Sequence, residues 1–229
     1  MNNVSPYYDD KVISQAMGAG EHRAFIGGVW DELGTLQFET LKQHGLKPSH
    51  TFLDLGCGCL RGGVHFIPYL EAGHYYGCDI NEDLLDVGYT QELTDQDRLK
   101  LPRDHLKTIG DFDFSPFETK FDYALALSVF THLPFNHIRI CLERLASHMK
   151  PSGVFFATSF LIDEGEPSYR PYAHPVGGVT TQGAEDPYHY YFSDFVACIR
   201  KTPWSVERVS GFEHPRSQSL LKFSISGST

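Results

Sequence analysis

Short hydrophobic runs alternate with longer stretches of helical pattern from residue 51 to the end of the chain. The runs are rich in aliphatic and aromatic residues and are bounded by Gly, Pro, Asn or Asp, as buried strands are. Continuous apolar strands that alternate with helices predict a mostly parallel sheet covered on both faces. The sequence therefore predicts a doubly wound α/β fold with seven strands, the last of them antiparallel. The predicted strands are residues 51–58, 74–80, 106–111, 121–130, 154–161, 204–209 and 220–226, and the predicted helices are residues 61–71, 81–93, 135–149 and 192–201.

The N-terminal part of the chain has a different pattern. Residues 1–20 are polar and predict a loose arm. Apolar residues recur at helical spacing over residues 21–45, where Gly27-Gly28 predicts a bend or two short helices. We therefore expect residues 1–48 to form an N-terminal arm and helical cap, and residues 49–229 to form the main domain.

One later segment also departs from the regular alternation. Residues 163–191 are rich in Pro, Gly, Tyr and His. A loop of this length inside a compact domain is usually a lid or a binding loop. We expect this segment to be a lid or substrate loop.

Composition and charge exclude several classes of protein. The chain has 229 residues, with 29 acidic and 19 basic side chains and a formal net charge of −10. This balance argues against a nucleic-acid partner, because binding phosphates requires a basic surface. No run of about 18 apolar residues predicts a membrane-spanning helix, and the first residues lack the pattern of a secretory signal. The odd number of cysteines, five, favours reduced thiols in a cytoplasmic protein.

The most informative motif is LDLGCGCLRGG, followed by YYGCDIN. Gly56 and Gly58 come directly after a predicted strand and allow the backbone to turn tightly and approach a ligand. Asp79 ends the next predicted strand, where a carboxylate can accept hydrogen bonds from a ribose. A dinucleotide-binding protein has the same outline, but Asp54 would repel a pyrophosphate and suits a ligand with an ammonium and a sulfonium. The motif therefore favours S-adenosylmethionine.

These motifs resemble those of the class I S-adenosylmethionine-dependent methyltransferases, which have a Rossmann-like fold. The resemblance covers residues 51–226 and rests on LDLGCG, GCDI, GDFDF, FDYALALSVFTHL and MKPSGVFFATSF, in that order. Where the family has a third glycine, this chain has Cys59. The segments GCLRGG, SVFTHLP and EHPRSQ look like those of bacterial methyltransferases that act on small molecules.

The resemblance implies a role for nine residues of the chain. Three would line the methionine part of the cofactor near an acid, two would hold the ribose and flank the adenine, two would contact the adenine, and one would lie beneath the methyl donor. In that order, these residues are Gly56, Cys57 and Gly58 with Asp54; Asp79 and Ile80; Asp111 and Phe112; and Ser128.

Other interpretations of these residues stay open. Asp54 could be a structural carboxylate at a strand end, and Asp79 could cap a helix, although Asn81 is better placed for that role. Asp111 and Phe112 could be turn and core residues. Cys57 and Cys59 could be imagined as a metal pair, but no second Cys pair and no matching His spacing accompany them, so we expect no metal.

The acceptor side is less well defined by the sequence. His132 follows the predicted fourth strand and is the candidate catalytic base or substrate-orienting group, since His is the usual base near neutral pH. Its alternative role is that of a cap or packing residue. Five further residues are candidates for substrate contact, with the alternative that they lie in solvated turns; these are Tyr172, His189, Tyr191, His214 and Arg216.

We therefore predict an S-adenosylmethionine-dependent methyltransferase that acts on a small-molecule acceptor at oxygen, such as a sugar, a phenol or a secondary metabolite. The alternatives are N-methylation of a small amine or a protein, a non-catalytic protein that binds the same cofactor, and a nicotinamide-dependent oxidoreductase. We expect neither a nucleic-acid nor a membrane partner, and a homodimer is compatible with the sequence.

Overall fold

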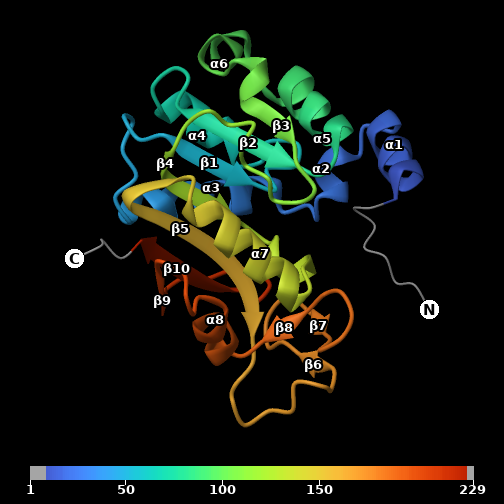
Figure 1. The fold of residues 1–229 in the computed structure, drawn as a ribbon. Coiled ribbons are helices and arrows are strands. Elements are labelled where there is room, and N and C mark those ends of the chain that lie inside the picture. The colour runs from blue at the N-terminus through green and yellow to red at the C-terminus, as the bar shows by residue number, and fades with distance from the viewer. Residues whose placement is uncertain (1–8, 226–229) are drawn as a thin grey trace. The chain divides into compact units, whose positions relative to one another are not determined.

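The computed structural model describes residues 9–225 (Figure 1). Within this range the strands follow the order β3-β2-β1-β4-β5-β10-β9, and β8 pairs with β5. The predicted α/β class is confirmed, with a mixed, mostly parallel arrangement in which β10 is antiparallel to its neighbours. Contacts group the described residues into two compact units, residues 9–124 and residues 125–225, and each is described by itself.

The first unit is built on short parallel strands. They are β1 (Phe52–Leu55), β2 (Tyr75–Asp79) and β3 (Leu106–Thr108), followed by the first residues of β4 (Phe121–Ala126). β1 pairs parallel with β2, and β2 pairs parallel with β3 (Figure 1). All four residues of β1 are buried, as its apolar run predicts. Since parallel strands end at the same edge, the loops after β1, β2 and β3 share one edge.

Helices and tighter turns connect and precede these strands. Gly27 and Gly28 both have positive φ, 94° and 62°, and separate α2 from α3, which confirms the predicted break. The prediction of a loose arm was wrong for residues 10–18, which form α1 on an N-cap from Asp9. The helices are α1 (Asp10–Gly18), α2 (His22–Phe25), α3 (Trp30–Gln43), α4 (Gly63–Tyr69), α5 (Glu82–Val87) and α6 (Asp95–Lys100), with a π-helical turn at Gly88–Glu92 and a 3₁₀ turn at Arg103–His105.

The predicted helix over residues 81–93 is two elements. Asn81 caps α5, its side chain accepting a hydrogen bond of 3.1 Å from Leu84 N. The chain then widens into the π-helical turn at Gly88, where it passes directly over Cys59. A Cβ at position 88 would lie 2.7 Å from the Cys59 carbonyl carbon. The absence of a side chain at Gly88 therefore permits this close backbone approach.

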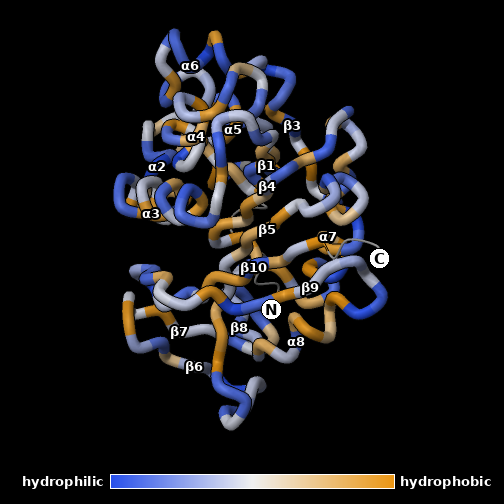
Figure 2. Tube along the Cα trace, turned by 90° about the vertical axis from the view of Figure 1, so that its left-hand side faces the viewer, coloured by the Kyte–Doolittle hydropathy of each residue, from blue (hydrophilic) through white to orange (hydrophobic). Residues whose placement is uncertain are grey.

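The second unit carries the longest strand and the antiparallel pairs. Its strands are β5 (Met149–Leu161), β8 (His189–Tyr190), β9 (Trp204–Arg208) and β10 (Ser219–Ile225), and its helices are α7 (Phe135–Ala146), α8 (Phe192–Cys198) and a 3₁₀ turn at Phe130–His132. β10 runs antiparallel to both β5 and β9. Figure 2 shows hydrophobic stretches along β5 and β10. The Trp204 indole donates to Leu142 O at 2.8 Å, which ties the start of β9 to α7.

Two boundaries in this unit differ from the sequence prediction. Met149 begins β5 rather than ending the preceding helix, and residues 151–153, which lie between the predicted helix and strand, belong to the strand. A positive φ of 68° at Ser152 records a local distortion in this Pro-Ser-Gly stretch. The pairing of β5 with β10 covers residues 154–159, which match most of the predicted strand.

The predicted irregular segment 163–191 contains regular pairing. β6 (Tyr172–Ala173) and β7 (Thr180–Thr181) form an antiparallel ribbon, and β8 adds to β5 in parallel. The segment is thus anchored to the end of β5. Its role as a lid stays a prediction, as does the domain boundary expected at residue 48. No helix among residues 9–225 is long and apolar enough to cross a membrane.

Replacing Gly88 by Ala tests the close contact between the π-helical turn and the glycine-rich loop. A Cβ would meet Cys59 backbone atoms at 2.7–2.9 Å, so backbone must shift even though Ala favours helix over Gly. We expect urea denaturation to show a loss of about 1–3 kcal/mol in the free energy of unfolding. The matched control is Gly110→Ala, where a Cβ meets nothing within 4 Å; an equal loss in both variants would contradict the proposed contact.

Candidate functional site

A tight turn follows β1 in the first unit. Gly56 and Gly58 have φ values of 71° and 53°, in the left-handed region that favours glycine. The amides of Gly56 and Cys57 both donate to Cys78 O, at 2.8 and 3.1 Å. Leu60 also has positive φ, 66°, which is uncommon for a branched side chain. The turn therefore holds an unusual backbone path against the end of β2, as the glycine pattern predicts.

Asp79 joins this turn to the end of β2. Its Oδ2 accepts a hydrogen bond of 2.9 Å from Gly58 N, and its Oδ1 accepts one of 3.1 Å from Asn81 N. Burial raises the pKa of Asp79 to about 6, against the opposite effect of these backbone donors. The alternative that Asp79 caps α5 is not what the structure shows, since Asn81 is the cap. Asp79 instead holds the glycine turn.

Asp54 lies inside the first unit, on β1. It is 4% exposed, and Tyr75 Oη donates to its Oδ2 at 2.8 Å. Burial raises the pKa of Asp54 to about 7, although the Tyr75 hydroxyl and the Arg61 guanidinium favour the charged form. A positively charged ligand near these two carboxylates would lower both pKa values. The pair is thus suited to a cation.

Two residues that the motif reading did not use support this turn. Arg61 is buried, and its guanidinium donates to Ile26 O and Gly28 O at 3.3 and 3.1 Å. The Arg61 charge therefore stabilises the break between α2 and α3. Ile26 also approaches Gly58, where a Cβ would lie 3.3 Å from Ile26 Cγ2. The segment before α3 thus packs on the glycine turn.

A second polar contact holds the same segment. Glu92 accepts hydrogen bonds from His22 Nε2 at 2.5 Å and from Arg23 Nη2 at 2.6 Å, and its side chain is 5% exposed. Burial alone would raise the pKa of Glu92, but the bonds from Arg23 and His22 bring it below its usual range. The residues in this contact are 69 or 70 positions apart, so no local pattern indicates it.

The loop after β3 carries two predicted adenine contacts. β3 ends at Thr108, so the predicted strand over residues 106–111 was too long, and Asp111 and Phe112 lie in the loop. Asp111 is exposed and its Oδ1 accepts from Asp113 N at 3.0 Å, while Phe112 has a positive φ of 62°. A non-glycine residue in this conformation is a common feature of functional loops. Two other predicted cofactor residues lie at the ends of β1 and β2. Cys57 is buried within the turn after β1, and Ile80 follows Asp79 and is half-buried.

The second unit places His132 in a pair with a carboxylate. His132 Nδ1 lies 2.6 Å from Asp186 Oδ1, and their side chains are 33% and 13% exposed. Asp186 comes from the segment predicted as a lid and was missed by sequence reasoning, since 54 residues separate the two. A carboxylate on Nδ1 fixes the neutral ring with its lone pair on Nε2. The pair can therefore act as an oriented base.

Ser128 starts the turn that leads to His132. It has a positive φ of 59°, and its amide donates to Thr158 Oγ1 at 2.7 Å. Its hydroxyl donates to Gln218 Oε1 at 3.0 Å, and the Thr158 hydroxyl donates to the same oxygen at 2.6 Å. Ser128 thus connects the 3₁₀ turn to the residues before β10.

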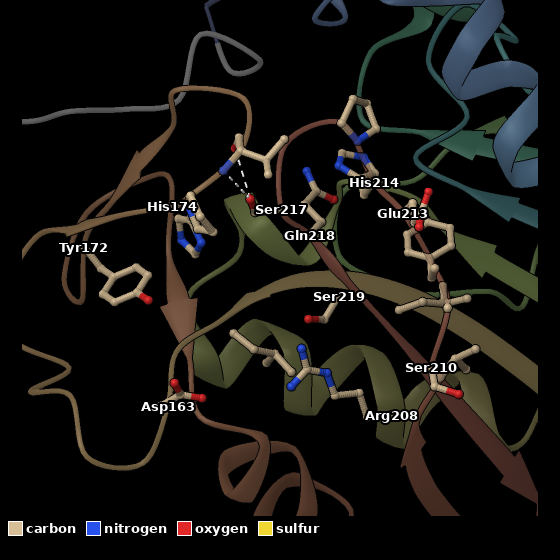
Figure 3. A pocket seen from close by; sticks show the side chains of 18 residues that line it. Asp163, Tyr172, His174, Arg208, Ser210, Glu213, His214, Ser217, Gln218 and Ser219 are labelled. Carbon is tan, nitrogen blue, oxygen red and sulfur yellow. Dashed lines mark hydrogen bonds between the residues drawn. The ribbon is translucent and has the colours of Figure 1, made fainter.

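A pocket of about 850 Å³ lies within the second unit, between the end of β5, the β6–β7 ribbon and the turn from β9 to β10 (Figure 3). Tyr172 and His214, two predicted substrate residues, line it. His189 and Tyr191 hold the segment together instead: His189 bonds Thr181 and Ser168, and Tyr191 donates to Glu166 O. The Arg216 amide donates to His214 Nδ1 at 3.1 Å.

The five cysteines do not form disulfides, and all are buried. Burial raises the pKa of the Cys59 thiol to about 12. Cys59 fills the position where the related family has its third glycine, and its side chain is directed toward His22 O at 3.8 Å. The loop therefore accommodates the departure from the motif by burying the sulfur. Among residues 9–225, no three His, Cys, Asp or Glu side chains are grouped as metal ligands are.

Residues 53–155 match the family model of a methyltransferase domain. Over this range the chain is similar to methyltransferase domains. The matched range begins on β1 and ends within β5, so it includes the glycine turn, Asp79 and His132. The resemblance to class I S-adenosylmethionine-dependent methyltransferases is thereby confirmed.

Solved structures with a fold similar to that of this chain include several methyltransferases. Magnesium protoporphyrin IX methyltransferase from Synechocystis PCC 6803, with bound SAM, is 16% identical with a TM-score of 0.62, over 98% of this chain and 99% of its own. An amino pentose methyltransferase from Micromonospora echinaspora is 14% identical, with a TM-score of 0.60 over 98% and 99%. A methyltransferase from Clostridium acetobutylicum is 12% identical, with a TM-score of 0.63 over 94% and 99%. At these identities the likeness shows the Rossmann-like methyltransferase fold.

The raised pKa of Asp54 predicts that the stability of this chain depends on pH. The folded chain holds the Asp54 proton more tightly than the unfolded chain, so this stabilisation is present at low pH and is lost as pH rises toward about 7. In urea denaturation without ligand, we expect the free energy of unfolding of the wild type, relative to Asp54→Asn, to fall by at least about 1 kcal/mol between pH 4.5 and 7.5.

The control for this measurement is Asp95→Asn, because the Asp95 side chain is 93% exposed. The difference between wild type and this variant is expected to change little over the same pH range. A flat difference for Asp54→Asn as well would show that Asp54 keeps an ordinary pKa.

Proposed function

We propose that the protein transfers a methyl group from S-adenosylmethionine to an oxygen of a small-molecule acceptor. The observation that carries this proposal is the pair of buried carboxylates, Asp54 and Asp79, at the tight turn after β1. Burial raises the pKa of Asp54 to about 7, against the effect of Arg61, and that of Asp79 to about 6, so further positive charge would stabilise the ionised forms. A ligand with an ammonium and a sulfonium supplies that charge.

The residues of the first unit fit this cofactor. The left-handed Gly56 and Gly58 bring backbone close to the ligand, and the carboxylate of Asp79 has further acceptor capacity for ribose hydroxyls beside its backbone donors. Asp111, Phe112 and Ile80 lie in the loops that follow β3 and β2, where adenine contacts are proposed. Bound S-adenosylmethionine supplies an already activated methyl group, so the chain contributes positioning and electrostatics first.

The same geometry separates this proposal from the nicotinamide-dependent alternative. A pyrophosphate is stabilised by amides at a helix N-terminus without nearby carboxylates. Here Asp79 already accepts from the Gly58 amide, and Asp54 lies two residues before the turn. Asp54 would repel a diphosphate, whereas a carboxylate at the position of Asp79 also occurs in dinucleotide-binding proteins. The arrangement therefore supports a cationic ligand.

The acceptor oxygen is proposed on the pair of His132 and Asp186. A hydroxyl loses its proton when its oxygen is methylated, so a positioned base accelerates the reaction. Asp186 keeps the His132 proton on Nδ1 and leaves Nε2 to receive the proton of the acceptor. A primary or secondary amine also loses a proton, which keeps N-methylation as the second candidate; a glycopeptide N-methyltransferase is among the similar structures, at 16% identity.

A small acceptor is proposed on two grounds. The net charge of −10 disfavours nucleic acid. Structures with this fold act on a porphyrin and on an amino pentose, according to their descriptions. A cytoplasmic location and a homodimer belong to the same proposal and rest on the sequence alone.

Calorimetry with S-adenosylhomocysteine and with NADH tests the cofactor assignment. We expect micromolar binding of the first and none of the second. Asp79→Ala is expected to weaken S-adenosylhomocysteine at least about tenfold, since charge-assisted hydrogen bonds contribute about 1.5–3 kcal/mol.

Because Asp79 also holds the glycine turn, the variant is first checked for folding by urea denaturation. Asp95→Ala on α6, far along the chain from the turn, serves as the matched control with unchanged affinity. Unchanged affinity in folded Asp79→Ala would remove the ribose assignment, and binding of NADH in place of S-adenosylhomocysteine would overturn the proposed function.

Variants of His132 and Asp186 test the proposed base. We expect His132→Gln to lower kcat about 100-fold or more, as loss of a general base does, with S-adenosylhomocysteine affinity unchanged. Asp186→Asn is expected to lower kcat as well, because an amide can donate to Nδ1 and so favours the wrong tautomer. His137→Gln, an exposed histidine on α7, is the control.

The pH profile of kcat decides between base and packing residue. A general base acts only in its unprotonated form, so we expect the wild-type rate to rise with pH, and in His132→Gln this limb of the profile is expected to disappear. An unaltered rate and profile in the folded His132→Gln variant would exclude His132 from the chemistry.

A further inference from the structure

The pocket of the second unit is held in shape by contacts between its two turns. Val176, in the turn from β6 to β7, exchanges hydrogen bonds of 3.0 Å with the Ser217 hydroxyl through its amide and its carbonyl, as the dashed lines in Figure 3 show. Gly177, in the same turn as Val176, packs closely on the turn from β9 to β10. A Cβ at position 177 would lie 2.6 Å from Pro215 O. The two walls of the pocket are therefore joined before any ligand binds.

A chain of hydrogen bonds fixes the protonation of His174, which lines this pocket. Ser168 O can only accept, so His189 Nε2, at 2.9 Å, must donate. In neutral His189, Nδ1 then accepts the hydroxyl proton of Thr181 at 2.8 Å, since it is much closer to this hydroxyl than Tyr172 O at 3.5 Å. The Thr181 oxygen in turn accepts from His174 Nε2 at 2.9 Å.

This chain leaves His174 Nδ1 with a lone pair. Burial and the neighbouring His189 lower the pKa of His174, so the neutral ring is the form present near pH 7. The ring is held in place by Phe160, with ring centroids 4.6 Å apart, and by an edge contact with Tyr172 at 4.9 Å. His174 is therefore an oriented hydrogen-bond acceptor.

Two other lining residues are oriented as donors. Gln218 is buried, and its Oε1 accepts from the hydroxyls of Thr158 and Ser128, which leaves the amide NH₂ as the group it can offer. The Arg216 amide donates to His214 Nδ1, so the proton of neutral His214 is on Nε2. Figure 3 shows His174 and His214 on either side of Gln218.

We propose that this pocket binds a hydroxyl-rich ring of the methyl acceptor, a neutral sugar, with His174 Nδ1 accepting from one hydroxyl and the Gln218 amide donating to another. This inference rests on the proposed methyl transfer and names the substrate class. Each hydroxyl both donates and accepts, so a sugar satisfies fixed groups of both kinds. The volume of about 850 Å³ is within the range of small-molecule sites.

Other acceptor classes fit the pocket less well. The charged side chains that line it are Asp163, Glu213 and Arg208, with more negative than positive charge, so the lining does not favour a phosphate or carboxylate. A flat aromatic ligand would bury the oriented His174 and Gln218 without partners, which disfavours binding. The carboxylates leave an amine-bearing ligand as the rival outcome.

The pocket is linked to the proposed base within the same unit. Ser128, which bonds Gln218, lies four residues before His132, and its carbonyl accepts from the Thr131 hydroxyl at 2.9 Å. Asp186 precedes His189 of the hydrogen-bond chain by three residues. Substrate-orienting groups and the base thus lie on connected segments. We expect His174 variants to raise KM and His132 variants to lower kcat.

Saturation-transfer NMR on the full chain tests the proposal, with millimolar methyl glycosides of glucose, galactose and xylose as probes. Phenol and ethanolamine represent the rival classes. We expect the glycosides to bind and His174→Gln to weaken them about tenfold, as the loss of a buried hydrogen bond does. His137→Gln, an exposed histidine exchanged in the same way, is expected to leave binding unchanged.

Thr181→Val and Thr181→Ser separate the hydrogen-bond chain from simple packing. Thr181 does not line the pocket, so Thr181→Val removes only the hydroxyl that orients His174, and Thr181→Ser retains it. Long-range ¹⁵N NMR is expected to show the His174 proton on Nε2 in the wild type and in Thr181→Ser. In Thr181→Val we expect a mixture of tautomers and glycoside binding weakened toward the His174→Gln level.

The outcomes distinguish this inference from the proposed function. Absence of glycoside binding, or binding of phenol or ethanolamine alone, overturns the sugar assignment. Unchanged glycoside binding in His174→Gln overturns the role of His174. S-adenosylhomocysteine calorimetry on the same samples is independent: glycoside binding without cofactor binding refutes the methyltransferase proposal and leaves a sugar site, and the reverse result refutes only the sugar site.

Discussion

The hydrogen bond from the Gly58 amide to the Asp79 carboxylate is the contact on which the first unit's site depends. It connects the loops that end two neighbouring parallel strands, and it is possible only because Gly58 adopts a left-handed backbone. The bond places one carboxylate against the turn while Asp54 remains beneath it on β1. Negative charge and backbone curvature are therefore produced by the same few residues.

The local parts of this arrangement could be predicted from the sequence. The apolar run before Gly56, the acid at the end of the next strand and the Asn81 cap are all short-range patterns, and each is present in the structure. Helix α1 was missed, although Val12, Ile13 and Met17 recur at helical spacing after its N-cap, Asp9. Strand β5 includes the Pro-Ser-Gly turn signal at residues 151–153, and its pairing with β10 begins directly after it, at Val154.

The parts that could not be predicted are pairs of polar residues distant in sequence. His132 was found because it follows a strand, but its partner Asp186 lies in a segment without periodicity. Arg61 donates to a backbone carbonyl of the segment before α3, and Glu92 accepts from His22 in the same segment. Neither has a motif, since the bonds depend on how separate elements pack. The motif residues could be found in the sequence, whereas the pairing of His132 with Asp186 required the coordinates.

Gly183 shows how small a structural change would alter the second unit. A methyl group at this position would collide with the carbonyl oxygen of Ser168. This oxygen accepts from His189 Nε2 and so determines the tautomers of His189 and His174. The direction in which the hydrogens along that chain point is thus set at its Ser168 end. The ligand selectivity of such a site can therefore depend on a residue that does not contact the ligand.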